Sequence, residues 1–514
     1  METIAQIKIE KLFFPQTKET ALKNIDIKIN KGDFIVITGG VASGKSVFLH
    51  AITGAIPHYY QGELEGKVTL MGQDIKEVSL NQMSRYVGYM MQEPQNQLIS
   101  LDIYDDVSFG LGNLELPVEE IDEIVQDTLE FVGLKGYEKR PTSSLSGGQA
   151  QRVVLAGVLA LRTPMLILDQ PTAELDPYGR HELYQRLGQL NKKRNLTIVL
   201  VMDRIEEVIN YANRVFYMEE GEIIREYLPE EYLKKRNEEL NKRLEKRSLG
   251  QSKNYQDRQD HEVVVNLSNV SYRYPNNYPG CEGINLKIFR GDFLAVIGLN
   301  GSGKSTLAKL IAGLLMPSQG TIEVFEEAMN KKNLHKIRAR IGFLFQNPDH
   351  QIFADSLAEE VGFSLKLRGE EKEVINKKID ESLEFVGLLK YKDLHPQRLS
   401  RGQRQLLALA SVLVGDPELI IADEPTSGLD ENQGYMIMDK LADLARQGKT
   451  ILLITHDLTM AQNYSNRMVA LQNHRLQLDI PTSNLKEYLK PLRDINLDFS
   501  NITAFNELCE EQGG

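Results

Sequence analysis

Short runs of apolar residues alternate with longer stretches of mixed polarity, and the same order of runs occurs twice along the chain. Residues 33–38 and 292–297 form one pair of runs, and each leads directly into a glycine-rich loop. Residues 166–168 and 419–422 form a second pair, and each of these runs ends at a carboxylate. Continuous apolar runs of this length predict strands that are buried in a parallel sheet. We therefore expect an α/β fold in each half, with ligands at the carboxyl ends of the strands.

The two halves are copies of one unit, because matched positions keep a nearly constant separation. Lys304 follows Lys45 by 259 residues. The separation is 254 residues for four later pairs, which are Gln92 with Gln346, Leu145 with Leu399, Asp169 with Asp423, and Asp203 with Asp457. A fixed offset of this kind indicates a duplication. The offset changes where the first copy has the longer loop, between Gly54 and Gly66.

The duplication divides the chain into four segments. We expect one domain in residues 1–228 and a second domain in residues 263–480. Between them, residues 229–262 carry mixed charges at helical spacing and then polar residues, which predicts a solvent-exposed helix followed by a flexible linker. The C-terminal tail, residues 481–514, has no motif of its own.

The composition argues against several classes of protein. The formal net charge is −12 at pH 7, whereas a general nucleic-acid coat needs a basic surface. The two cysteines, Cys281 and Cys509, lack the spacing of a metal site. The N-terminus lacks the pattern of a secretory signal, and no apolar run approaches the roughly 20 residues that span a bilayer. Any membrane role therefore depends on a partner protein.

Both copies contain the phosphate-binding pattern G-x-x-x-x-G-K-S after a predicted strand and before a predicted helix. In such loops, backbone N–H groups hold phosphate oxygens, the lysine neutralises the β and γ charge, and the serine coordinates Mg²⁺. The predicted ATP-binding residues are Gly39, Gly40, Val41, Ala42, Ser43, Gly44, Lys45 and Ser46, and in the second copy Gly298, Leu299, Asn300, Gly301, Ser302, Gly303, Lys304, Ser305 and Thr306. Asp169 and Asp423, which end the later strands, complete two predicted magnesium sites with Ser46 and Ser305.

A further motif lies between each loop and its carboxylate. It consists of Ser146, Gly147, Gly148 and Gln149 in the first copy, and of Ser400, Arg401, Gly402 and Gln403 in the second. Other short motifs follow in matching order, namely Gln92, Gln346, Glu174-Leu175-Asp176, Gly428-Leu429-Asp430 and His456. With these motifs, nearly all of both copies resembles the ATP-binding cassette (ABC) superfamily. The resemblance implies an α/β fold of two tandem ABC-type P-loop NTPase domains, each with a RecA-like α/β core, an antiparallel β subdomain and a helical subdomain.

The resemblance also suggests roles for single residues. Gln92 and Gln346 would contact both ATP and Mg²⁺. The motifs that begin at Ser146 and Ser400 are similar to the signature motif of the family, and the four residues of each would contact ATP. Phe14 and Tyr274, each about 25 residues before its phosphate loop, are similar to the aromatic residues that stack on adenine. Ordinary packing in the core is the alternative for these two side chains.

Domains of this family pair head to tail, so that each ATP lies between the phosphate loop of one domain and the signature motif of the other. One site would combine the first-copy signature motif with Lys304, Ser305, Asp423, Glu424 and His456. By resemblance, Glu424 is the general base and His456 holds the γ-phosphate. This site has every group that hydrolysis needs.

The other site would combine the second-copy signature motif with Lys45, Ser46, Asp169, Gln170 and Met202. An amide such as Gln170 is too weakly basic to accept a proton from water, and Met202 offers no N–H donor. We expect this site to bind ATP and to hydrolyse it poorly, unless other residues compensate. Arg401 could either disturb the approach of the backbone to phosphate or bind that phosphate itself.

The segments around Gln346 and Gln92 resemble one subgroup of ABC proteins in particular. Residues 345–353 resemble the stretch after the Gln loop, the loop that contains Gln346 here, in ATPases of energy-coupling-factor (ECF) transporters, which take up vitamins and transition-metal ions. Residues 91–99, around Gln92, are a looser match. This resemblance implies a transmembrane coupling subunit and a substrate-binding membrane subunit as partners, no nucleic acid, and a peripheral position on the cytoplasmic side of the cell membrane. The alternatives are a fused ABC importer ATPase for sugars and a soluble ribosome-associated ABC ATPase. The sequence does not identify the transported solute.

Overall fold

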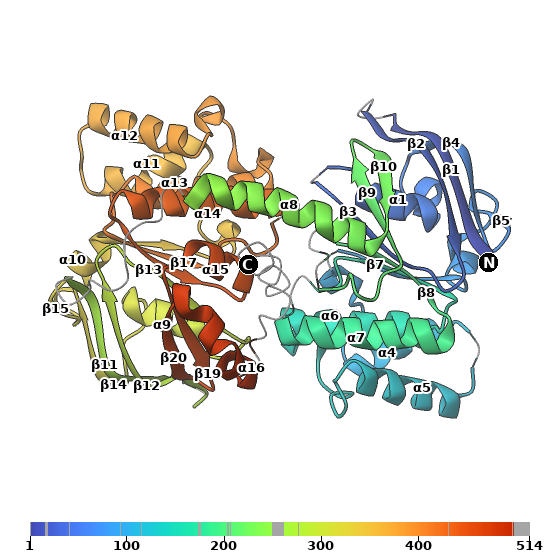
Figure 1. Ribbon diagram of the computed structural model, residues 1–514, viewed down its shortest axis with the longest axis horizontal. Coiled ribbons are helices and arrows are strands. Elements are labelled where there is room, and N and C mark those ends of the chain that lie inside the picture. The colour runs from blue at the N-terminus through green and yellow to red at the C-terminus, as the bar shows by residue number, and fades with distance from the viewer. Residues whose placement is uncertain are drawn as a thin grey trace, which may run out of the picture. The chain divides into compact units, whose positions relative to one another are not determined.

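The computed structural model contains two compact units, of which the first extends to Leu240 and the second begins at Asn241 (Figure 1). The structure describes residues 2–15, 19–40, 42–92, 94–114, 116–172, 175, 177–202, 205, 207–248, 262–275, 277–429, 431–495 and 497. Within these residues, no helix is both long enough and apolar enough to cross a membrane.

The first unit is built on a six-stranded sheet. Its strand order is β10 (Glu222–Tyr227), β9 (Arg214–Glu219), β3 (Phe34–Gly39), β8 (Thr197–Val201), β7 (Met165–Asp169) and β6 (Val87–Met90). The strands from β9 to β6 are parallel, and β10 pairs with β9 in the antiparallel direction. This sheet confirms the predicted α/β fold, because β3 and β7 coincide with apolar runs that precede the phosphate loop and end at Asp169.

A second, antiparallel sheet and a set of helices complete the first unit. The antiparallel sheet has the order β2 (Glu19–Asn30), β1 (Thr3–Phe14), β4 (Glu63–Leu70) and β5 (Gln73–Asp74). The helices of the core are α1 (Lys45–Ile52), α2 (Ala55–His58), α3 (Leu80–Met83) and α7 (Pro177–Arg194). The helical subdomain consists of α4 (Ile103–Gly112), α5 (Val118–Phe131) and α6 (Gly147–Ala160), which contact one another.

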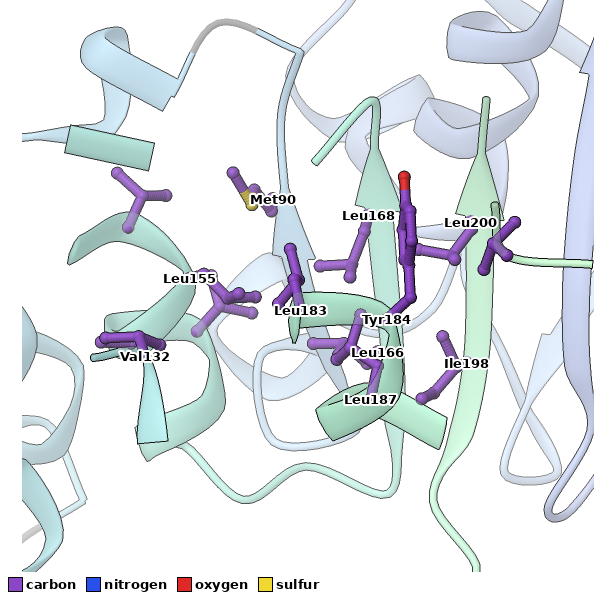
Figure 2. Packing of buried hydrophobic residues seen from close by; sticks show 14 of the residues in the cluster. Met90, Val132, Leu155, Leu166, Leu168, Leu183, Tyr184, Leu187, Ile198 and Leu200 are labelled. Carbon is purple, nitrogen blue, oxygen red and sulfur yellow. The ribbon is translucent and has the colours of Figure 1, made fainter. Parts of the chain in front are cut away.

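Alternate residues of β3 enter two different cores, as a strand buried on both faces requires. Phe34 and Val36 pack with α6 and α7, whereas Ile35 and Ile37 pack with α1 and the antiparallel sheet. Figure 2 shows the first of these cores, in which Leu166, Leu168 and Tyr184 lie between the sheet and its helices. The two cores hold the start of α1 against the carboxyl end of β3, and this junction forms the phosphate loop.

The second unit repeats the architecture. Its antiparallel sheet has the order β12 (Pro279–Phe289), β11 (Val263–Arg273), β14 (Gln319–Val324) and β15 (Glu327–Ala328). Its six-stranded sheet has the order β16 (Ile341–Leu344), β17 (Leu419–Asp423), β18 (Thr450–Ile454), β13 (Phe293–Gly298), β19 (Arg467–Gln472) and β20 (Arg475–Pro481). Its helices are α9 (Lys304–Ile311), α10 (Leu334–Ala339), α11 (Leu357–Leu367), α12 (Lys372–Phe385), α13 (Arg401–Leu413), α14 (Glu431–Arg446) and α15 (Leu458–Tyr464).

The sequence predicts a helix at the start of residues 229–262, and the structure has one there, whereas the helices of the tail are not predicted. Helix α8 (Pro229–Ser248) begins the expected linker, and its Tyr232 is buried against Tyr227 of β10. The start of this segment is therefore anchored on the first unit. In the tail, the 3₁₀ helix η7 (Thr482–Tyr488) and helix α16 (Leu489–Asp494) bury Leu485 and Leu492 in the second unit.

Candidate functional site

The phosphate loop of each unit joins the carboxyl end of a parallel strand to the start of a helix. In the first unit, Lys45 Nζ donates hydrogen bonds to the carbonyl oxygens of Gly39 and Gly40, at 2.7 and 2.8 Å. In the second unit, Lys304 Nζ donates to the carbonyl oxygens of Gly298 and Leu299, at 2.8 and 3.0 Å. Each lysine therefore lies folded over its own loop, where a phosphate group would meet its charge.

The glycine before each lysine is required by geometry. Gly303 has a φ of 102°, and a β-carbon on it would lie 2.3 Å from the carbonyl oxygen of Gly280. Only glycine tolerates both this backbone conformation and this close approach. The neighbouring Ser302 Oγ is buried and has no hydrogen-bond partner among the described residues. A cradle of this kind fits an anionic ligand that supplies acceptor oxygens.

The predicted magnesium ligands meet in both units. Ser46 Oγ donates to Asp169 Oδ2 at 2.8 Å, and Ser305 Oγ donates to Asp423 Oδ1 at 3.0 Å. Burial raises the pKa of Asp423 to about 6, and the nearby charge of Glu424 adds to this effect, while the hydrogen bond from Ser305 opposes it. A buried carboxylate beside a hydroxyl fits a hard cation such as Mg²⁺, which prefers oxygen ligands. Within the described residues, no cluster of three or more His, Cys, Asp or Glu side chains exists that could hold a metal alone.

The side chains that follow the two aspartates differ, although their backbones are alike. Glu424 and Gln170 have φ angles of 49° and 51°. Glu424 is buried, and its Oε2 lies 2.9 Å from His456 Nδ1. Gln170 instead accepts a hydrogen bond on Oε1 from Gln92 Nε2, at 3.3 Å. A carboxylate and an imidazole thus face each other in the second unit, where the first unit has a pair of amides.

The constant offset of 254 residues predicts that Met202 takes the position of His456, and the structure corrects this prediction. The backbone N–H of Met202 donates to the carbonyl oxygen of Ile37, and that of Thr455 donates to Val296 in the same way. Ile37 and Val296 both stand two residues before the first glycine of a phosphate loop. Met202 is therefore the counterpart of Thr455, and the first-unit counterpart of the histidine is the next residue in the sequence.

That next residue, Asp203, lies outside the described residues. The register shifts because β8 begins at Thr197, which is 28 residues after Asp169, whereas β18 begins at Thr450, which is only 27 residues after Asp423. The Met202 side chain is buried in the core, where its sulfur accepts a hydrogen bond from the Tyr184 hydroxyl at 3.3 Å. Met202 is therefore a core residue, and Asp203 takes its place in the prediction of a degenerate site.

The signature motifs begin helices α6 and α13 and cap them. Ser146 Oγ accepts from the backbone N–H of Gln149, and Ser400 Oγ accepts from that of Gln403, each as part of a capping box. Arg401 packs directly on Gly428, because a β-carbon at that position would lie 2.5 Å from the guanidinium carbon. The bulk of Arg401 is thus accommodated by glycine in the loop that follows Glu424.

The aromatic candidates lie near the phosphate loops. The hydroxyl of Tyr274 is hydrogen-bonded to Thr306 Oγ1 at 3.0 Å, which ties β11 to the start of α9. Phe14 is half-buried against the core of the first unit. Tyr278 was not predicted from the sequence, yet its hydroxyl would lie 3.9 Å from a β-carbon on Gly301, beside the second phosphate loop, and its ring is exposed. Its distance from the loop in sequence, across the turn before β12, hides this proximity.

The other predicted residues are Gln346 and several residues outside the described part of the chain. Gln346 is exposed, and within the described part of the chain no hydrogen bond joins it to Ser305 or Asp423. The structure does not describe the predicted residues Val41, Glu174, Asp176, Asp203 and Asp430.

Comparison with known proteins agrees with this geometry. Residues 22–173 and 281–427 match the family model described as ABC transporter. A relative from Caldanaerobacter subterraneus subsp. tengcongensis, named as an ABC transporter ATP-binding protein, is 34% identical over 504 residues, covering 90% of this chain and 88% of the relative. One from Methanosarcina acetivorans with the same kind of name is 34% identical over 534 residues, covering 94% and 87%. The solved structure of cbiO1 from Clostridium perfringens, described as part of the ABC transporter complex cbiONQ, is 32% identical, with a TM-score of 0.43, and covers 48% of this chain and 99% of cbiO1.

Proposed function

Because the chain belongs to the ABC transporter family, as an ATP-binding subunit that hydrolyses ATP to energise transport, we propose that it works in an ECF-type importer with unequal ATP sites. One site hydrolyses ATP, and the other holds ATP and turns it over slowly. The observation that carries this proposal is the 2.9 Å approach of His456 Nδ1 to Glu424 Oε2, in contrast to Gln170 on the same backbone in the first unit.

In this proposal the two units pair head to tail. The hydrolytic site takes its phosphate loop, Asp423, Glu424 and His456 from the second unit, and its signature motif, which begins at Ser146, from the first. The slow site takes its loop and Gln170 from the first unit, and its signature motif, with Arg401, from the second. Each unit therefore contributes to both sites, so the first unit is needed for hydrolysis although it lacks a general base.

At the hydrolytic site, Glu424 and His456 have complementary roles. Glu424 Oε2 faces the imidazole, which leaves Oε1 to accept a proton from the attacking water. His456 lies against Glu424 through Nδ1, so its other ring nitrogen, Nε2, can donate to the γ-phosphate. Ser305, Asp423 and Gln346 would hold Mg²⁺, which supplies positive charge to the phosphates when bound.

At the slow site, the groups that bind ATP are kept and the base is lost. Lys45, Ser46 and Asp169 have the same contacts as their counterparts in the second unit. Gln170 is held by Gln92, so its amide can orient a water molecule without accepting its proton. Loss of a general base typically lowers a rate by about 10²- to 10⁴-fold. This site can therefore keep the units together while the other site turns over.

A membrane partner is supported by exposed apolar side chains at matched positions after each Gln loop. Ile99 and Phe109 are 62% and 56% exposed in the first unit, and Phe353 and Phe363 are 64% and 42% exposed in the second. Phe353 and Phe363 contact each other edge to face, with ring centroids 4.7 Å apart. Exposed apolar side chains that recur in this way favour a protein interface. We propose that each set receives one cytoplasmic helix of a transmembrane coupling subunit.

The ECF assignment rests on residues 345–353 and, more loosely, on residues 91–99. It implies a second membrane subunit that binds a vitamin or a transition-metal ion, and a peripheral position on the cytoplasmic side of the membrane. Affinity purification of the tagged chain from detergent-solubilised membranes tests the assignment. Recovery of small hydrophobic subunits supports it, whereas recovery of a sugar-importer permease or of ribosomes without a hydrophobic partner would replace it with one of the two alternatives.

A further inference from the structure

The first unit contains a cavity of about 270 Å³ beside the amino ends of β7 and β8, whereas the phosphate loop follows the carboxyl end of β3. The cavity lies between α5, α6 and α7, and its apolar wall includes Phe131, Val158, Leu166 and Leu190. Figure 2 shows Leu166 near the amino end of β7, with Leu168 nearer the carboxyl end. Ligand pockets commonly occupy about 300–1,000 Å³ and combine apolar walls with a few polar groups. The cavity approaches this range and has no role in the proposed ATP sites.

The rim of the cavity is basic. Lys31, Arg162 and Arg194 line it, and Asp127 is the acidic residue among the lining residues, so the lining has a positive formal charge. Lys31 already pairs with Glu2, at 3.2 Å. Arg162 and Arg194 form no ion pair with any carboxylate that the structure describes. Two cations beside an apolar wall, without acidic partners, favour an anionic ligand.

The charged residues at the equivalent position of the second unit differ from those of the first. Asp416 is the counterpart of Arg162, and the two have φ angles of 51° and 50°, so their side chains leave equivalent turns. Asp416 pairs with Lys449 at 2.5 Å. Glu418, where the first unit has a proline, pairs with Arg290 at 3.1 Å. The second unit thus pairs its own charges here, whereas the first unit has Arg162 where the second has an acid.

We propose that this cavity binds a small organic anion with an apolar body, such as a medium-chain carboxylate. The carboxylate would pair with Arg162 and Arg194, and the apolar body would enter between Phe131, Val158 and Leu190. The cavity corresponds to roughly nine water-sized volumes, which matches a ligand of about that many non-hydrogen atoms. Because the wall joins α5 and α6 of the helical subdomain to α7 of the core, the bound anion would link the two parts of the first unit.

Isothermal titration calorimetry on the full chain, with octanoate, acetate and 1-octanol as probes, tests the proposal. Octanoate has both the anion and the apolar body, and each of the other two has one of them. We expect octanoate to bind at least tenfold more tightly than acetate and 1-octanol. Equal affinity for octanoate and 1-octanol would overturn the role of the arginines, and no heat from octanoate at millimolar concentration would overturn the site.

Charge variants locate the binding. Arg162→Asp gives the first unit the residue of the second, and Arg194→Ala removes the other cation; each should weaken octanoate binding at least tenfold. Lys192→Ala and Lys193→Ala are matched controls, because both lysines are exposed in the same last turn of α7 and do not line the cavity. Unchanged ATP binding shows that each variant is folded. Equal losses in the controls, or unchanged octanoate affinity in Arg162→Asp, would contradict the site.

Discussion

His456 Nδ1 lies 2.9 Å from Glu424 Oε2, so that the two side chains expected to act on the γ-phosphate already contact each other. Glu424 follows Asp423 at the end of β17, and His456 follows Thr455 after β18. These two strands are parallel neighbours in the sheet. Because the carboxyl ends of neighbouring parallel strands meet at one edge, two residues far apart in sequence can form one catalytic pair.

Replacement of Glu424 by glutamine should abolish steady-state ATP hydrolysis while preserving ATP binding. The amide keeps the size of the side chain and its contact with His456, but it cannot accept a proton from water. We expect turnover to fall by about 10²- to 10⁴-fold. Phosphate release measured at saturating ATP, beside ATP binding measured by filter retention, checks both parts. Turnover near that of the unchanged protein would show that the base lies elsewhere.

Gln170→Ala is the matched change in the first unit, and it should have little effect. A residue that makes no interaction in the rate-limiting transition state leaves kcat/KM unchanged, so we expect a change of less than about twofold. The same phosphate-release assay applies. A collapse of turnover in a correctly folded variant would mean that Gln170 contributes to the chemistry, and the division into a hydrolytic and a slow site would then be wrong.

The sequence predicts the phosphate loops and carboxylates well, because each depends on a local pattern that a short segment carries by itself. The strand Phe34–Gly39 and the helix that starts at Lys45 are examples. The register after β8 could not be predicted in this way. Asp203 and Asp457 give a false match at the expected offset, and the inserted residue that moves Met202 becomes visible only when the hydrogen bond to Ile37 is known.

The tail shows a different limit of sequence analysis. Helix α16 has six residues, too few for an apolar period to stand out, and it is held by tertiary burial of Leu492. Tyr278 was missed for a related reason, because only the fold brings the turn before β12 beside Gly301. Residues whose position depends on contacts between distant segments give no local signal.

Met202→Ala tests the corrected register. Since Met202 is buried and contacts Tyr184, truncation should destabilise the protein by about 2–5 kcal/mol, whereas Met202→Leu should cost less than about 1.5 kcal/mol. Thermal or urea unfolding measures both. If Met202 instead faced the nucleotide, Met202→Ala would leave stability unchanged and alter ATP affinity.

The raised pKa of Asp423 predicts how Mg²⁺ binding depends on pH. Without a cation, this carboxyl keeps a proton up to about pH 6, well above its usual range, because burial disfavours its charged form. The unfolded chain ionises at lower pH, so this group favours the folded state below about pH 4 and loses that contribution as the pH rises through 6. The proton also competes with Mg²⁺, and affinity should therefore fall as the pH drops below about 6.

Competition with Mn²⁺, followed by electron paramagnetic resonance in the presence of a non-hydrolysable ATP analogue, measures this dependence. The control is Asp423→Asn in a chain that also carries Asp169→Asn, because the first unit has its own Ser46–Asp169 pair. The change at Asp423 should weaken binding and remove the dependence on pH between 5 and 7 that remains in Asp169→Asn alone. A pH dependence that survives in the double variant would assign it to another group.

Phe363→Ser combined with Phe353→Ser should detach the chain from its membrane partner without impairing ATP hydrolysis by the isolated chain. Both rings are exposed, so their loss removes an apolar contact surface and little of the core. A buried aromatic anchor typically contributes about 2 kcal/mol or more to an interface, so recovery of hydrophobic subunits should fall by at least about tenfold. Met436→Ser is the matched control, because Met436 is an exposed apolar residue on α14, outside the segment that follows the Gln loop in sequence. Equal recovery with the Phe variant and the control would place the membrane contact on another surface, whereas loss with the Phe variant alone would assign it to the helix that follows the Gln loop.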